Sequence, residues 1–334
     1  MRIVGFGDLL IHFGPVMDQR FMQAELMQMS FTGAEANVCA ALALWGEDVS
    51  FVTAIPEHQL AKKSEAFLRG FGIDTRSIAH GEGRMGVYYL ERGVGVRASS
   101  VIYDRDDSVF TRSRFEDYDW DSIFDGVDAF YLTGITPTLS DRLFVLCEKV
   151  LGIAREKGLR VFYDVNLRTK LCGIEKAREI FAKMSPYITD LIGNEEHLKQ
   201  LLTIGSEYGE EERKERLSDI IAKTRAATGI ERIAVTVRRT PSASESVFFA
   251  AYSDGCSFAL SDIYRIKVLD RVGSGDAFSA GLVYAIANEY SVADTVDFAT
   301  ASCVMKHEIT NDINFASVEE IKSIIGRTSS DVRR

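Results

Sequence analysis

The segment from Gly273 to Asp276 contains the residues best suited to chemistry, because two glycines, Gly273 and Gly275, stand immediately before an acid. The apolar run that follows, from Ala277 to Ile286, predicts a buried helix. Glycines let the backbone turn sharply and approach a ligand closely. The first N–H groups of a helix have no partner within it, and they attract anions. An anion site beside the carboxylate of Asp276 would suit transfer of a phosphoryl group to an alcohol.

A simpler interpretation of this segment also exists. Many Gly-x-Gly pairs only turn the chain, and an acid in a first helical turn is favourable for the helix dipole alone.

A second candidate element lies near the N-terminus, where Gly33 opens an apolar helix and Asn37 falls on its first turn. The glycine would expose backbone N–H groups to a ligand, and the asparagine offers a donor and an acceptor to a polyol. A helix start with a locally bonded asparagine is the alternative.

Three polar residues, Asp164, Asn166 and Arg168, follow a strongly apolar strand-like segment. The carboxyl end of a strand in an open α/β sheet is where ligands bind. The forked donors of Arg168 suit an anionic group. The alternative is a surface arginine on a solvated loop.

A possible sugar-binding face is carried by Tyr103 and Arg105, which are two residues apart in a strand-like segment and so share one face. The preceding strand contains Tyr88 and Tyr89, and one of these could add a hydroxyl to that face. Tyrosine and arginine together could hold an acidic sugar. Exposed residues of an edge strand are the other interpretation.

The segment Asn194-Glu-Glu-His197 follows another short strand. Its carboxylates could hold Mg²⁺ through water, because this ion usually keeps several waters in protein sites. A charged helix start explains the same residues.

Strand-like and helix-like segments alternate along the chain. The expected strands are Arg2–Gly7, Val49–Ile55, Ala129–Thr133, Leu159–Asp164 and Asp190–Gly193, and the expected helices include Ala34–Trp45 and His58–Phe71. This alternation predicts an α/β fold with a mostly parallel central sheet flanked by helices. Such a sheet would gather the polar residues above at the ends of its strands.

Two segments interrupt the alternation. Met17–Thr32 is expected to be a strand-poor connector, whereas Met85–Tyr103 alternates around Gly93-Val-Gly95 and predicts a β-hairpin. The hairpin could be a lid, a dimer surface or an ordinary edge hairpin. Gly205–Glu215 is expected to be a charged loop and helix start, and Thr328–Arg334 a frayed tail.

Composition excludes several classes of function. The 334-residue chain has a net charge of −10 and no sustained basic block, which argues against nucleic acid or an anionic membrane as a partner. Its five cysteines show no Cys-x-x-Cys spacing, so neither a zinc site nor a disulfide framework is expected. No apolar run reaches the length of a membrane span, and the N-terminus shows no signal peptide. We therefore expect a cytoplasmic protein that gathers positive charge only locally.

Taken together, these pieces resemble the ribokinase / phosphofructokinase-B family of sugar kinases. Asp270–Phe278 is similar to the family's C-terminal signature and Gly33–Asn37 to its N-terminal one, in the right order and separation. Within the family the details are most similar to the 2-keto-3-deoxygluconate kinases. The pieces that carry this similarity are Gly33–Val38, Tyr103–Arg105, Leu132–Thr136, Asp164–Arg168 and Asn194–Glu196.

The resemblance implies a ribokinase-like fold, with one domain over residues 1–334 and a β-lid formed from about 12–32 and 84–105. It implies that ATP and Mg²⁺ take part, that K⁺ does so in some members, and that two copies pair through the lid. The implied reaction moves the γ-phosphoryl group of ATP to the primary hydroxyl of 2-keto-3-deoxygluconate, a sugar acid, and gives 2-keto-3-deoxy-6-phosphogluconate.

The resemblance also assigns residue roles. Asp276 would take the proton from the substrate hydroxyl, and the anion hole would be formed by Gly273, Ser274 and Gly275 with the Asp276 N–H. The residues implied to hold the sugar acid are Gly33, Asn37, Tyr89, Tyr103, Arg105, Ile135 and Arg168. Those implied to contact the nucleotide are Asn194, Thr236, Arg238, Gly273 and Gly275, and Glu196 would approach the metal.

Two departures from the family pattern leave alternatives open. The family's Asn-x-x-Glu metal motif would need a glutamate where His197 stands, and either Glu195 or Glu196 could substitute for it. The usual glycine-rich turn after a Val-Thr strand is replaced by Val235–Ser244. A kinase of another sugar, such as fructose, ribose or a nucleoside, and a non-catalytic sugar-binding relative are therefore alternative functions.

Overall fold

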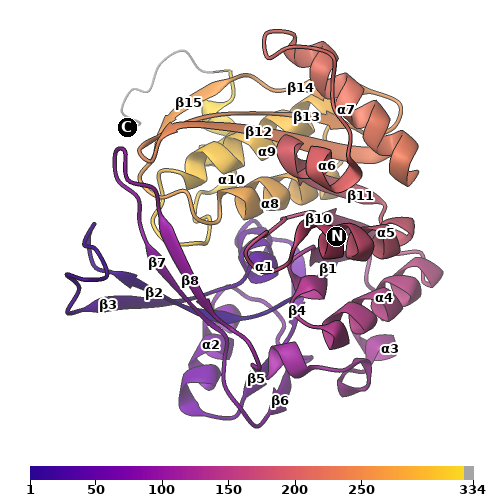
Figure 1. Cartoon of the computed structure of the whole chain (residues 1–334). Helices are drawn as coiled ribbons and strands as arrows, with labels where there is room; N and C mark the ends of the chain where they lie inside the picture. The colour runs from indigo at the N-terminus through magenta and orange to yellow at the C-terminus, as the bar shows by residue number, and fades with distance from the viewer. Residues whose placement is uncertain (327–334) are drawn as a thin grey trace.

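The computed structural model describes residues 1–326, and its centre is a nine-stranded sheet (Figure 1). The strand order is β14-β13-β12-β11-β10-β9-β1-β4, and β15 pairs with β13. The six strands that run parallel to one another are β4 (Asp48–Val52), β1 (Arg2–Phe6), β9 (Ala129–Thr133), β10 (Arg160–Asp164), β11 (Asp190–Asn194) and β12 (Arg232–Ser242). Those in antiparallel pairs at the far edge are β13 (Glu245–Ser253), β14 (Phe258–Leu260) and β15 (Tyr264–Lys267). The predicted mostly parallel sheet is confirmed.

Successive side chains of a strand point to opposite faces of a sheet, and this sheet accordingly has a core on each face. Ile3 belongs to one core and the next residue, Val4, to the other. The helices over the first core are α1 (Ala34–Leu44), α2 (Gln59–Gly70), α8 (Ser274–Ala287), α9 (Val292–Lys306) and α10 (Val318–Ile324). The helices over the second core are α3 (Trp120–Ile123), α4 (Asp141–Glu156), α5 (Ile174–Met184), α6 (Glu195–Leu202) and α7 (Arg213–Thr228).

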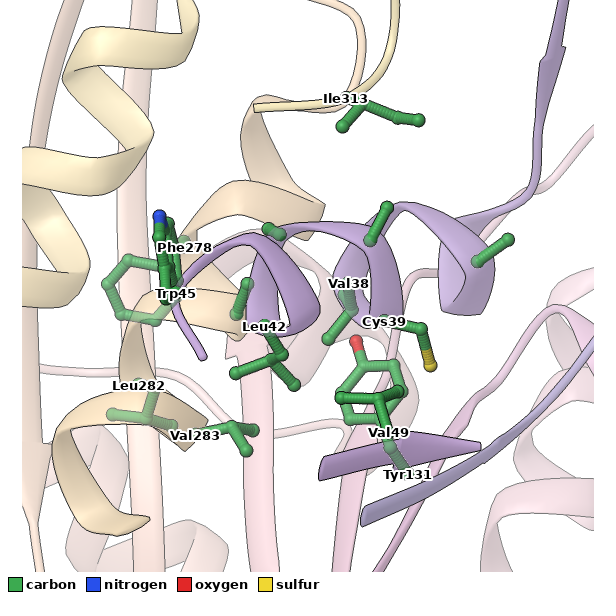
Figure 2. Close-up of a cluster of buried hydrophobic side chains, with 14 of the residues drawn as sticks. Val38, Cys39, Leu42, Trp45, Val49, Tyr131, Phe278, Leu282, Val283 and Ile313 are labelled. Carbon is green, nitrogen blue, oxygen red and sulfur yellow. The ribbon is translucent and has the colours of Figure 1, made fainter. Parts of the chain in front are cut away.

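Helices α1 and α8, which carry the two sequence motifs, pack against each other in the first core. Figure 2 shows Leu42 of α1 close to Leu282 and Val283 of α8, over the sheet residues Val49 and Tyr131. This contact brings together the starts of two helices that are more than two hundred residues apart in the chain. The relative position of the two motifs is therefore set by the hydrophobic core.

Local sequence signals set the helix ends. His58 caps α2 by accepting a hydrogen bond from the Ala61 N–H (3.1 Å), and Ser317 and Glu320 form a capping box at the start of α10. Gly229, with φ of 73°, ends α7 in the left-handed conformation. The helices predicted at Ala34–Trp45 and His58–Phe71 are confirmed as α1 and α2.

A second sheet, of four strands, lies beside the main sheet in the order β3-β2-β7-β8 (Figure 1). Its strands are β2 (Leu10–Pro15), β3 (Met27–Thr32), β7 (Val87–Glu91) and β8 (Ser100–Asp104). The predicted hairpin is confirmed, because β7 and β8 pair antiparallel. The prediction of a strand-poor connector at Met17–Thr32 was wrong, since β3 occupies its last six residues. Met27, Met29 and Phe31 alternate with polar residues there, and the methionine-rich composition concealed this two-residue period.

The tip of the β7–β8 hairpin is attached to the main sheet. The carbonyl of Gly95 accepts a hydrogen bond from the Ala243 N–H (2.7 Å), and the Gly95 N–H donates to the Ser244 hydroxyl (2.8 Å). Ala243 and Ser244 form the turn between β12 and β13. In this conformation the four-stranded sheet therefore extends as a lid over the ends of the parallel strands.

The strand expected at Val49–Ile55 is divided into β4 and β5 (Ala54–Pro56), and β5 pairs with β6 (Ala79–Gly81). The charged segment from Gly205 leads into α7, as expected. The predicted tail lies outside the described residues. Among residues 1–326, no helix has the length and apolar character needed to cross a lipid bilayer.

Candidate active site

One cavity, with a volume of about 550 Å³, lies between the lid and the carboxyl ends of the parallel strands. It gathers most of the residues predicted from the two motifs and the strand ends. The predicted residues that line it are Gly33, Asn37, Tyr103, Arg105, Ile135, Arg168, Asn194, Thr236, Arg238, Gly273, Ser274, Gly275 and Asp276. Tyr89 and Glu196 do not line it. Sequence positions from 33 to 276 thus converge on one space.

The turn before α8 has the open backbone expected of an anion site. Gly273 has φ of 73°, and a Cβ atom there would lie 1.8 Å from the carbonyl oxygen of Asp312, so only glycine fits. Within residues 1–326, no hydrogen bond uses the N–H of Gly273, Gly275 or Asp276. The N–H of Ser274 is different, because it donates to the carbonyl of Arg271 at 3.2 Å. Three backbone donors, and not that of Ser274, are therefore available to an anion in the cavity.

The carboxylate of Asp276 lies in the cavity wall and is held by one side chain. Asn37 Nδ2 donates to Asp276 Oδ2 at 2.7 Å, and Thr32 Oγ1 in turn donates to Asn37 Oδ1 at 2.9 Å. Burial raises the pKa of Asp276 to about 7, while the Asn37 hydrogen bond opposes this shift, the nearby Asp164 charge adds to it and Arg168 opposes it. A carboxylate whose pKa lies near neutrality is suited to accept a proton from an alcohol.

A second acid, Asp164, lies beside Asp276 at the end of β10. Ser279 of α8 donates to its Oδ2 at 3.1 Å, and the Asn166 N–H donates to its Oδ1 at 3.0 Å. Burial raises the pKa of Asp164 to about 6 against both hydrogen bonds. The charge of Asp164 in turn contributes to the raised pKa of Asp276, because a nearby like charge disfavours the ionised form.

The lid supplies a different tyrosine from the one implied by the resemblance. Tyr88 stands directly opposite Tyr103 in the β7–β8 register and lines the cavity with it. Tyr89 stands opposite Ile102, so it points away from the cavity, and its ring stacks on Phe13. The sequence left the choice between the two tyrosines open, and only the strand register decides it.

Two of the predicted arginines that line the cavity differ in their partners. Arg105 is buried and forms an ion pair with Asp8, with 2.8 Å between Arg105 Nη2 and Asp8 Oδ2. Its Nε atom is buried and has no hydrogen-bond partner within residues 1–326. Arg168 is exposed to the cavity, and no carboxylate of the described residues pairs with it. Arg168 is therefore the more available partner for an anionic ligand.

Sequence reasoning missed a buried network between the lid and the last part of the chain. His12 Nδ1 lies 2.8 Å from Asp312 Oδ2, and the Tyr88 hydroxyl donates to the other oxygen of Asp312. The rings of His12 and Tyr88 stack with 4.4 Å between their centroids. Although burial opposes it, the hydrogen bonds from His12 and Tyr88 lower the pKa of Asp312. No local motif predicts this network, because its residues come from three separate segments that meet only in the folded protein.

The part of the cavity wall formed by Asn194, His197, Arg238 and Arg271, called the donor end below, has positive charge, and neither Glu195 nor Glu196 lines it. Glu195 is fully buried and points toward Lys199, Arg216 and Arg239, at 2.8, 3.4 and 3.6 Å. Glu196 is on the outer surface, 3.3 Å from Lys199, so the structure does not support the metal-binding role predicted for it. Within residues 1–326, no group of three or more His, Cys, Asp or Glu side chains is arranged for a metal ion.

An α/β sheet, a helix start with free amides, a buried acid and a covering lid surround one cavity, and these are features that transfer of a phosphoryl group to an alcohol requires. The chain belongs to the pfkB family of carbohydrate kinases, whose model matches residues 2–314. The resemblance found in the sequence, the ribokinase-like fold and the enzyme class are thereby confirmed.

Known proteins match nearly the whole chain. The 2-dehydro-3-deoxygluconokinase of Thermotoga maritima has a solved structure that superposes with a TM-score of 0.93 at 34% identity, covering 97% of this chain and 98% of that one. The 2-dehydro-3-deoxygalactonokinase of Haloferax volcanii is 24% identical over 328 residues, which is 97% of this chain and 96% of that protein. An Escherichia coli protein solved with ATP and Mg²⁺ shares the fold, with a TM-score of 0.80 at 15% identity over 96% of this chain and 98% of that one.

Proposed function

We propose that this protein uses ATP to phosphorylate the primary hydroxyl of 2-keto-3-deoxygluconate, giving 2-keto-3-deoxy-6-phosphogluconate. One observation carries the proposal: the buried carboxylate of Asp276 and the unused amides of the α8 start share a cavity with the unpaired guanidinium of Arg168. The first two suit phosphoryl transfer to an alcohol, and the third suits an acidic acceptor. The names of the Thermotoga and Haloferax relatives support this class of acceptor.

The acceptor would lie under the lid. Arg168 would face its carboxylate, with Tyr103 and Arg105 beside it, and Asn37 would bind a hydroxyl through the part of its amide that is not used by Asp276. Gly33 keeps this end open, since a Cβ atom there would lie 2.0 Å from the carbonyl oxygen of Asp8. This arrangement orients the primary hydroxyl toward Asp276.

In the proposed reaction Asp276 accepts the proton of that hydroxyl as the oxygen attacks the γ-phosphorus of ATP. Negative charge in the transition state spreads over the transferring oxygens. The N–H groups of Gly273, Gly275 and Asp276 would donate to those oxygens, and the helix start adds partial positive charge. Positioning and electrostatics by this chain's own residues thus account for most of the catalysis.

We propose that Mg²⁺ enters with the nucleotide, because the residues around Asn194 offer no carboxylate to the cavity. The ion would supply charge neutralisation to the phosphates and would keep several of its waters. Participation of K⁺, a single domain over residues 1–334 and a cytoplasmic location remain predictions.

The proposal is tested by ATP consumption with a panel of acceptors: 2-keto-3-deoxygluconate, its galactonate epimer, fructose, ribose and a nucleoside. We expect the keto-deoxy sugar acids to be good substrates and the neutral sugars poor ones. Arg168→Ala should weaken binding of the sugar acid by roughly 1.5–3 kcal/mol, the value of a hydrogen bond to a charged group. Arg265→Ala, which removes an exposed arginine of β15, is the control. Equal activity on fructose would indicate another acceptor, and inactivity on every sugar would indicate a non-catalytic relative.

We further propose a homodimer that pairs through the lid. The lid face away from the cavity carries a row of apolar side chains, Met29, Phe13, Tyr89 and Ile102, that are adjacent in the strand register. Ile102 is 53% exposed. Ile102→Asp should shift the sedimentation coefficient from that of a dimer to that of a monomer, whereas Val145→Asp, on exposed α4 surface, should leave it unchanged. A monomeric wild type, or a dimer that survives Ile102→Asp, would refute this proposal.

A further inference from the structure

Three arginines line the cavity without a carboxylate partner, and they come from three separate parts of the fold. Arg168 follows β10, Arg238 belongs to β12, and Arg271 precedes the turn of α8. Within residues 1–326, no carboxylate oxygen lies within 4.0 Å of their guanidinium nitrogens. In a chain of net charge −10, acids to pair with them are abundant. Unpaired arginines around one cavity therefore indicate that the cavity takes anionic groups.

These positive charges act on one another. Arg238 is exposed to the cavity, and partial desolvation there, with the charges of Arg271 and Arg168, lowers its pKa. Burial, with the charges of Arg168 and Arg238, lowers the pKa of His197 to about 4, so its imidazole is neutral at physiological pH. An anion bound among these side chains would relieve their mutual repulsion.

Arg271 is held in place by the turn that also holds the lid. Its Nη2 donates to the carbonyls of Ser242 and Ala243, at 3.1 and 2.6 Å. No hydrogen bond within residues 1–326 uses its Nε or Nη1. Arg271 therefore keeps unused donors next to the free N–H of Gly273, and its orientation is fixed before any ligand binds.

A divalent cation finds no ligand set at this end. The three positively charged partners of Glu195 keep it in the protein interior, Glu196 lies on the outer surface, and the residue that reaches the cavity from α6 is the neutral His197. The arginines would repel a cation that is not already bound to phosphate. The donor end is thus built to bind anions without a protein-bound metal.

We propose that Arg238 and Arg271 bind the β- and γ-phosphates of the donor nucleotide directly, so that the nucleotide binds to this protein without a divalent metal. This inference rests on the proposed function, because it takes the nucleotide to be the anion at this end. Arg168 remains with the acceptor carboxylate. Guanidinium N–H donors would do here what a carboxylate-held metal does elsewhere, with N–H groups in place of a bound cation.

Calorimetric titration of the full-length protein with ATP, once in excess EDTA and once in excess Mg²⁺, tests the inference. We expect the two dissociation constants to agree within about threefold. In EDTA, Arg238→Met and Arg271→Met should each weaken ATP binding by about 10- to 100-fold, because each removes a hydrogen bond between charged groups. Arg265→Met should bind like the wild type. ATP binding that is lost in EDTA, or that survives both substitutions, would overturn the inference.

His197→Glu provides the reverse test. A carboxylate at this position would repel free phosphate and attract a cation, so binding in EDTA should weaken at least about tenfold more than binding in Mg²⁺. An unchanged ratio of the two dissociation constants would contradict the proposed position of the phosphates. Thermal unfolding of each variant shows that it is folded.

The outcome separates this inference from the proposed function. Metal-free binding of ATP with no phosphorylation of any sugar acid would refute the proposed function alone. Phosphorylation of the sugar acid by a protein that binds ATP only with Mg²⁺ would refute this inference alone.

Discussion

Asp276→Asn should lower kcat by a factor on the order of 10²–10⁴ and change the affinity for the sugar acid much less, as expected for loss of a general base. The amide can still accept the hydrogen bond of the substrate hydroxyl, but it cannot take its proton. The substitution keeps the size of the side chain, and Asn37 can still bond to its oxygen. Turnover by the coupled ATP assay and sugar-acid binding by calorimetry separate the two effects. Near-normal turnover would exclude Asp276 as the base.

The pH profile gives this prediction a second readout. Only the ionised carboxylate accepts a proton, and the pKa of Asp276 is raised to about 7. The wild-type kcat/KM should therefore be constant above this pH and fall about tenfold per pH unit below it. The residual activity of Asp276→Asn should lack this acidic limb, that is, the fall of kcat/KM at low pH.

Asp164→Asn is the matched control, because it changes a neighbouring buried acid that does not face the reacting oxygen in the proposed reaction. Removal of this charge takes away one cause of the raised pKa of Asp276. The limb should move to lower pH, with a much smaller loss of kcat than in Asp276→Asn. An unmoved limb would mean that another group titrates.

The parts of the site that the sequence predicted are those encoded within a few residues. The turn from Gly273 to Asp276 is such a part, since glycine, the helix start and the acid are consecutive. The same holds for Asn37 on the first turn of α1 and for Arg168 after β10. The alternation of strands and helices likewise predicts the parallel sheet, and the rule for ligand sites in such sheets predicts where these residues meet.

What the sequence did not predict depends on register or on distant contacts. Tyr88 and Tyr89 are neighbours in the chain, and only the pairing of β7 with β8 decides that Tyr88 faces the cavity. Asp312 contributes through its contact with the Gly273 turn and its bonds to the lid, and nothing in its neighbours indicates either.

The departures at His197 and Val235–Ser244 have a common structural consequence. The first places a neutral imidazole where the family has an acid, and the second contributes Arg238 and the turn that orients Arg271. Separately, each departure left alternative functions open. Together they leave Arg238 and Arg271 beside a neutral imidazole in the cavity wall, which a residue-by-residue comparison with a motif could not show.

Gly273→Ala should inactivate the enzyme and destabilise the fold together. The left-handed backbone at this position costs a residue with a Cβ atom about 1–2 kcal/mol. The added methyl group would also meet the carbonyl of Asp312, a backbone atom, at 1.8 Å. The turn must therefore shift, and the amides that stabilise the transferring phosphate shift with it. Misplacing one such donor costs a factor on the order of 10²–10³ in kcat.

Gly275→Ala is the matched comparison, because this glycine lies two residues further on, in the first turn of α8. No atom lies within 4 Å of the Cβ position there, and the backbone does not require glycine. Alanine in a helix should raise the free energy of unfolding by roughly 0.5–1 kcal/mol. The KM for ATP should nevertheless rise, since the methyl group would project into the space that the phosphate is proposed to occupy. Thermal unfolding and steady-state kinetics of the two variants therefore distinguish the two roles of glycine. At Gly273 the backbone conformation requires glycine, whereas at Gly275 only the space proposed for the phosphate requires it. A Gly275→Ala enzyme with unchanged ATP kinetics would place the phosphate elsewhere.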